Sequence, residues 1–135
     1  MIELKHIVLI LIAHFVADFC LQPRKIAETK SEKISALCIH GIYYLIGTTV
    51  SLFLFMITGI LRAKEIPIDP LLSIIKFLII NAVFHIIIDF VTSKISAYFY
   101  KKQMIRQFFI VIGADQVIHI IILIYSFSWF VTNPF

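Results

Sequence analysis

Cysteine is scarce in this chain, and its spacing excludes two common kinds of small protein. The 135 residues include only two cysteines, Cys20 and Cys38, which do not form a CxxC pair. They therefore indicate neither a disulfide scaffold nor a zinc ribbon. The sequence also lacks a Ser/His/Asp or Cys/His nucleophile motif. Any hydrolysis would therefore use activated water rather than a covalent intermediate.

Charged residues are also few, and they stand between apolar runs. Charged residues make up 15% of the chain and hydrophobic residues 61%, whereas soluble domains are about 45–50% apolar. A water-soluble core of this length cannot enclose so many large apolar side chains. The net charge of +4 is spread over the connections, which argues against nucleic-acid binding. The composition instead predicts an integral membrane protein.

Four apolar segments are long enough to cross a bilayer as helices, which takes about 20 residues each. The first carries His14 and Asp18 and lacks an A-x-A-like cleavage site, so we interpret it as a retained span rather than a signal peptide. Pro23 is expected to end it. We predict an all-α, four-helix transmembrane bundle that forms a single integral membrane domain over residues 1–135. The expected spans cover residues 2–22, 34–61, 71–100 and 104–131.

Basic residues predict how the helices are oriented. The first and third connections each hold four Lys or Arg residues, whereas the second holds two beside two acidic residues. By the positive-inside rule, the first and third connections are cytoplasmic and both termini lie outside. We therefore expect a multi-pass protein of the cell inner (plasma) membrane. The oligomeric state stays open, with a homo-oligomer as one alternative.

Seven His and Asp residues lie well inside the expected spans, with at least one on every span. Three pairs are separated by four residues, which places both members on one helix face. An Asp facing lipid costs about 2.5–3.5 kcal/mol at mid-helix, so these faces should point into the bundle. Antiparallel packing then brings all seven to one layer, about 8–20 Å from the cytoplasmic surface. The residues are His14, Asp18, His40, His85, Asp89, Asp115 and His119.

This combination of imidazoles and carboxylates is typical of sites for zinc, manganese or iron. Seven candidate ligands suit two ions better than one, and the ions would offset the burial of the carboxylates, as in other helix bundles. We predict a divalent-metal site, with zinc or manganese favoured. Asp18 or Asp115 is the candidate base for a metal-activated water. Gln22 and Gln116 are candidates for orienting the ligands, with simple interfacial polar residues as the alternative.

Two other functions stay open on the sequence. A proton or metal-ion transporter or channel component would need a polar path to both faces, and the outer halves of the spans hold few polar residues. A non-catalytic assembly subunit would use the polar layer only for hydrogen bonds between helices. Lys30 and Lys94 are interpreted as positive-inside anchors, with a phosphate or anionic headgroup as the alternative contact.

Several polar strings follow one another along nearly the whole chain. They are His14 with Asp18-Phe19-x-Leu21-Gln22, then Lys30, His40, His85 with Asp89, Lys94, and Asp115-Gln116-x-x-His119. This order resembles a family of small bacterial and phage membrane proteins, domain of unknown function 3307, whose name carries no activity. More distantly, it is similar to predicted membrane-bound metal-dependent hydrolases. That analogy implies metal-assisted hydrolysis of a phosphoester or lipid ester, with membrane lipid as partner.

Overall fold

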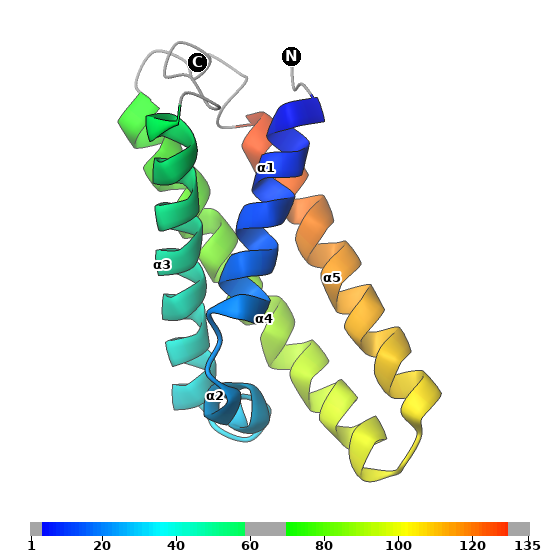
Figure 1. Ribbon diagram of the computed structural model, residues 1–135. Coiled ribbons are helices and arrows are strands. Elements are labelled where there is room, and N and C mark those ends of the chain that lie inside the picture. The colour runs from blue at the N-terminus through cyan, green and yellow to red at the C-terminus, as the bar shows by residue number, and fades with distance from the viewer. Residues whose placement is uncertain (1–3, 59–69, 130–135) are drawn as a thin grey trace.

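A computed structural model describes residues 4–58 and 70–129, and these ranges are helical with short turns between helices. The helices pack as a bundle (Figure 1). The expectation of an all-α bundle is confirmed. In chain order the elements are α1 (Leu4–Phe15), the π-helix η1 (Val16–Cys20), α2 (Arg24–Thr29), α3 (Ile34–Ile57), α4 (Pro70–Lys101) and α5 (Ile105–Phe127).

Three of the helices are long and apolar enough to cross a membrane, namely Ile34–Ile57, Leu72–Lys101 and Ile105–Phe127. The first expected span is shorter than predicted, because α1 has 12 residues and η1 adds five. It packs beside the three long helices without reaching their length (Figure 1). Residues 2–3, 59–61 and 130–131 of the expected spans lie outside the described ranges.

Polar residues lie inside the bundle and large apolar residues lie outside. His40, His85 and Asp89 are among the largest fully buried side chains, whereas Phe53 and Ile110 are more than half exposed. In water this arrangement would be unstable, because the exposed apolar surface would be far larger than soluble proteins tolerate. A bundle surrounded by lipid is expected to have this arrangement. The chain is therefore a membrane protein.

The first helix ends through a π-turn and a proline. The Leu21 N–H donates to the Val16 carbonyl oxygen at 3.0 Å, five residues back, and Asp18 lies within this π-turn. Such turns are rare and are frequent at functional sites. Pro23 then adopts an extended conformation before α2, and the helix ends at Cys20, three residues before this proline.

The two basic connections lie at the same end of the bundle. The Lys101 ammonium donates to the Glu32 carboxylate at 2.9 Å, which joins the end of α4 to the first connection and lowers the pKa of Glu32. The α4–α5 turn and α2 both lie at the lower end in Figure 1. This agrees with the expectation that both connections lie on one side of the membrane. That this side is the cytoplasmic one stays a prediction.

A hydrophobic cluster fills the opposite half of the bundle. Its buried members come from α1, α3, α4 and α5, and the helix ends near it lie at the upper end in Figure 1. The cluster is dry packing of aliphatic and aromatic side chains, so the polar residues gather toward the α2 end. Its members are Ile10, Leu52, Phe77, Leu78, Leu123 and Phe127.

The π-turn approaches α3 closely at Gly47. A Cβ atom at this position would lie 2.8 Å from Leu21 Cδ1 and 2.9 Å from the Ala17 Cα and Cβ atoms. We expect Gly47→Ala to lower the free energy of unfolding by about 1–3 kcal/mol, because the backbone of Ala17 must move. Gly113→Ala is the matched control, since nothing lies within 4 Å of its added Cβ. Denaturant unfolding in detergent compares them, and equal stabilities would contradict the close contact.

Candidate metal centre

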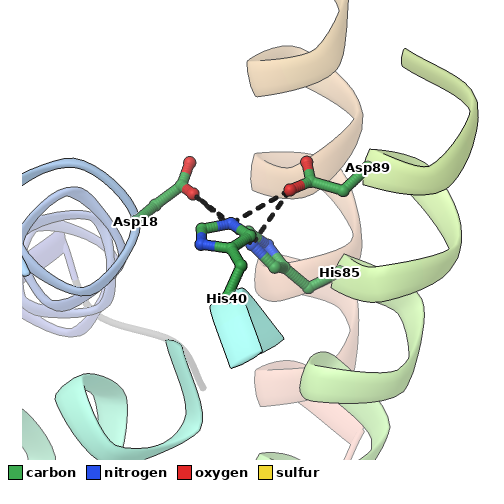
Figure 2. A group of neighbouring side chains, drawn as sticks. All are labelled: Asp18, His40, His85 and Asp89. Atoms are coloured by element: carbon green, nitrogen blue, oxygen red, sulfur yellow. Dashed lines mark hydrogen bonds and ion pairs between the residues drawn. The ribbon is translucent and has the colours of Figure 1, made fainter. Parts of the chain in front are cut away.

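Side chains from η1, α3 and α4 converge on one point inside the bundle. His40 Nε2 lies 3.1 Å from Asp18 Oδ1 and 3.0 Å from Asp89 Oδ2. His85 Nε2 lies 2.9 Å from His40 Nε2, 3.4 Å from Asp18 Oδ1 and 3.8 Å from Asp89 Oδ2. Figure 2 shows the four side chains directed toward one another. We call these four residues the closed group.

The spacing of the closed group fits a tetrahedral cation. Zinc holds nitrogen and oxygen ligands at about 2.0–2.1 Å, which places neighbouring ligand atoms about 3.3 Å apart. The five separations above range from 2.9 to 3.8 Å. All four ligand atoms lie within 4.8 Å of one another. Two carboxylates and two imidazoles so placed can hold a divalent metal ion.

A second set of ligand atoms shares Asp89 with the first. Asp89, Asp115 and His119 also offer atoms within 4.8 Å of one another, and we call them the open group. His119 Nδ1 lies 3.5 Å from Asp115 Oδ2, and His119 Nε2 lies 4.0 Å from Asp89 Oδ1. Among the described residues, neither ring nitrogen of His119 makes a hydrogen bond. A buried imidazole in this state is short of partners, which a cation would supply.

His14 lies in the same layer but outside both groups. Its Nε2 is 3.2 Å from the Gln116 Oε1 atom and its Nδ1 is 3.4 Å from the Tyr44 hydroxyl. It approaches Asp18 Oδ2 only to 3.9 Å. The structure thus brings six of the seven predicted residues into the two groups. His14 contacts side chains that surround them.

Gln116 links two of the candidate ligands. Its Nε2 donates to Asp18 Oδ2 at 3.1 Å and to Asp115 Oδ2 at 3.0 Å. Gln22 does something different. With its amide nitrogen toward the Asp18 carbonyl oxygen at 3.0 Å, its oxygen accepts from the Ala27 N–H at 3.2 Å. Gln22 therefore fixes the turn that carries Asp18, whereas Gln116 orients the carboxylates themselves.

Sequence reasoning underrated Lys30 and missed Tyr44 and Thr92. The Lys30 ammonium donates to Asp89 Oδ2 at 2.6 Å, so this lysine points into the bundle instead of anchoring its surface. The Tyr44 ring stacks on His85 with centroids 3.9 Å apart, and the Thr92 hydroxyl donates to an Asp115 oxygen at 2.6 Å. Tyr44 and Thr92 lie one turn beyond His40 and Asp89, and that spacing was the signal available for them.

Lys94 behaves as a surface residue. Its ammonium lies 3.5 Å over the Phe90 ring, on the outward side of α4, where Phe90 is exposed. This contact fits an interfacial cation over an aromatic ring. Lys94 therefore serves as a natural comparison for Lys30.

With its histidines neutral, as metal ligands must be, the layer has a charge that the chain itself does not balance. Asp18, Asp89 and Asp115 contribute −3 when ionised, and Lys30 contributes +1, which leaves −2 with neutral histidines. Buried charge of one sign is costly in an apolar surrounding. One divalent cation would neutralise the layer. The charge, the spacing and the lack of a hydrogen bond to His119 in the described part of the chain all point to a cation.

A cavity of about 640 Å³ adjoins the layer. Asp18, Asp89 and Asp115 lie on its wall, and from there it extends along α4 and α5 toward their connecting turn. Sites for small ligands commonly have volumes of about 300–1,000 Å³. The layer therefore borders a cavity on the side of the α2 end of the bundle, while the hydrophobic cluster fills the other end.

Comparison with known proteins places the chain in one family. The model of the family described as protein of unknown function (DUF3307) matches residues 6–134, and the chain belongs to that family. No curated protein and no solved structure matches it. The family is therefore the one that its polar strings resembled, and the site's chemistry has to be argued from its own geometry.

Gln116 offers a test of the layer that does not remove a candidate ligand. We expect Gln116→Leu to lower the affinity for Zn²⁺ about 10–100-fold, because the carboxylates lose the amide that orients them. Ser126→Ala is the control. Ser126 lies on α5, as Gln116 does, but its hydroxyl accepts a hydrogen bond from Asn81 outside the layer. Isothermal titration of purified protein with Zn²⁺ measures both. Equal affinities for the two variants would show that Gln116 does not orient metal ligands.

Proposed function

We propose that this chain is a membrane-embedded, divalent-metal-dependent hydrolase that acts on a phosphoester or lipid substrate near the cytoplasmic leaflet. The observation that carries the proposal is the position of Asp89, which belongs to both groups of ligand atoms. Four residues make the first group a closed site, whereas three leave positions for water and substrate in the second. Two residues of the open group, Asp89 and Asp115, line the cavity.

The donor set favours zinc or manganese. The closed group offers two imidazoles and two carboxylates, and the open group offers one imidazole and two carboxylates. Nitrogen and oxygen donors of this kind suit hard or borderline divalent ions. Such an ion lowers the pKa of water and polarises an ester oxygen, which is the chemistry that hydrolysis needs.

Asp115 is the better placed of the two candidate bases. Its side chain is 13% exposed against 5% for Asp18, so it can meet water in the cavity. In the reaction, a water oxygen bonds to the phosphorus or acyl carbon and the ester bond to the leaving alcohol breaks. Asp115 takes the proton that water loses and returns it to the leaving oxygen. The atoms balance without a covalent enzyme intermediate.

Transport of ions is disfavoured by what fills the other half of the bundle. A conducting path would have to pass the hydrophobic cluster, where Phe77 and Leu123 are 1% exposed. Two polar residues at that level bond to each other within the bundle, since Asn81 donates to both the Phe77 carbonyl oxygen and the Ser126 hydroxyl. The cavity borders the layer from one side, as an enzyme site requires. We therefore rank a transporter second and a purely structural polar layer third.

Metal content distinguishes these functions first. We expect two divalent ions per purified chain by inductively coupled plasma mass spectrometry, and about one after His119→Ala, because the open group then keeps two ligands. His6→Ala is the control, since His6 is equally buried but lies in α1 away from the layer. Wild-type protein without stoichiometric metal would contradict the proposal, above all if His14→Ala/His85→Ala is equally stable.

Hydrolysis supplies the second test. Metal-loaded protein in lipid nanodiscs should release alcohol from a phosphoester such as p-nitrophenyl phosphate, and chelation should abolish the activity. Asp115→Asn should lower kcat at least about 10²-fold, because it removes both the candidate base and one of the three ligand residues of the open group, while the closed group keeps its ion. Turnover that survives chelation would refute metal-dependent hydrolysis. Ion leakage from liposomes containing the protein would favour transport instead.

A further inference from the structure

The cavity beside the layer has two chemically different walls. Along α4, Asp89 is followed by Thr92, Ser93 and Ser96 on the cavity side, a stripe of hydroxyl groups. Along α5, the facing residues are Phe108, Val111 and Ile112. From Asp89 to Tyr100 the α4 wall runs about 16 Å along the helix. A ligand that fits such a space is polar along one side and hydrocarbon along the other.

The polar side contains groups that can bind an anion. Lys30 is the one cationic residue on the cavity wall among the described residues, and its side chain is 18% exposed. The Ser93 hydroxyl is buried and makes no hydrogen bond within the described part of the chain. Glu28 also lines the wall, but Arg24 offsets its charge at 2.7 Å. The Lys30 ammonium and the Ser93 hydroxyl are thus two donors on one cavity wall that can bind a phosphate.

Charge balance sets which anion fits. The layer carries −2 without metal, as counted above, so it would repel an anion. Two divalent ions contribute +4 and convert the layer to +2. A phosphate monoester carries about −1.5 to −2 at neutral pH, which matches this charge, whereas a phosphodiester carries −1. Anion binding should therefore require that both metal groups are loaded.

Lys30 links metal binding in the closed group to anion binding in the cavity. Its ammonium and His40 Nε2 both contact Asp89 Oδ2, at 2.6 and 3.0 Å. A divalent ion in the closed group would bind that same oxygen and repel the ammonium. Lys30 follows the short helix α2 on a flexible four-carbon side chain, so its ammonium can turn toward the cavity. An anion in the cavity would then accept a hydrogen bond from the Lys30 ammonium.

We propose that this cavity binds an amphiphilic phosphate monoester, with its phosphate at Lys30, Ser93 and the metal-loaded layer and its hydrocarbon chain along the α5 wall. The assignment rests on the proposed hydrolase and narrows its substrate to a lipid phosphate. Hydrolysis would release inorganic phosphate and the lipid alcohol. The cavity extends toward the end of the bundle that carries the basic connections, where an anionic headgroup would be attracted.

Binding of a non-hydrolysable analogue tests the assignment separately from catalysis. The probe is hexadecylphosphonate, whose C–P bond cannot be hydrolysed, and native mass spectrometry of Zn²⁺-loaded protein measures its binding. Methylphosphonate tests the phosphate group without a chain, and hexadecanol tests the chain without a phosphate. We expect hexadecylphosphonate to bind at least ten-fold more tightly than either, and EDTA to weaken it at least ten-fold.

Two pairs of variants locate the two ends of the ligand. Lys30→Met should weaken hexadecylphosphonate binding about ten-fold, because a charge-assisted hydrogen bond is lost, whereas Lys94→Met should have no effect. Ala97→Trp fills the cavity and should weaken hexadecylphosphonate at least ten-fold. Ile95→Trp is its control, because Ile95 faces outward on the same helix. Metal content of each variant confirms that it is folded.

The outcomes separate the two proposals. Equal affinity for methylphosphonate and hexadecylphosphonate would identify a free-phosphate site and overturn the lipid assignment. So would binding that is unchanged by Lys30→Met and Ala97→Trp. If p-nitrophenyl phosphate is hydrolysed while hexadecylphosphonate does not bind, the hydrolase stands and the lipid assignment falls. If hexadecylphosphonate binds as expected without hydrolysis of any phosphoester, the binding site stands and the hydrolase falls.

Discussion

A carboxylate buried among apolar helices has to be compensated, and the compensation of Asp89 organises this protein. Its two oxygens lie near the Lys30 ammonium and the imidazoles of His40, His85 and His119. These partners come from the first connection, α3, α4 and α5. The Asp89 side chain therefore ties four parts of the chain together at a depth where lipid could not solvate it. Removing it would leave Lys30 and three histidines without their common acceptor.

The rest of the bundle can be understood from that constraint. The π-turn moves Asp18 toward the same point, and Gly47 allows η1 to approach α3 closely enough for the carboxylate to arrive there. On the other side of the layer, packed aliphatic and aromatic side chains close the bundle. The protein is thus divided along its length into an apolar half and a half with polar groups and a cavity, which is an asymmetry suited to chemistry at one membrane surface.

The location of the site was largely predictable. Asp and His residues in apolar segments are costly unless they face inward, so the pairs four residues apart had to define the interior faces. Connections rich in basic residues indicated how the helices are oriented. That orientation placed the Asp and His residues of η1, α3, α4 and α5 at one depth. What the pattern could not separate was the role of His14 from that of His40. Both are buried histidines on one-face stripes, yet His14 hydrogen-bonds Tyr44 and Gln116.

The sequence alone determined that the chain lies in a membrane, that it is helical, and which Asp and His residues face the interior, because hydrophobic length and helical periodicity are local properties. Only the tertiary structure decided that the ligands divide into two groups sharing Asp89, that Lys30 turns inward, and that a cavity adjoins the open group. It also showed that the first helix is short and ends in a π-turn. These features depend on separations of a few ångströms between residues up to about a hundred positions apart, which no local pattern encodes.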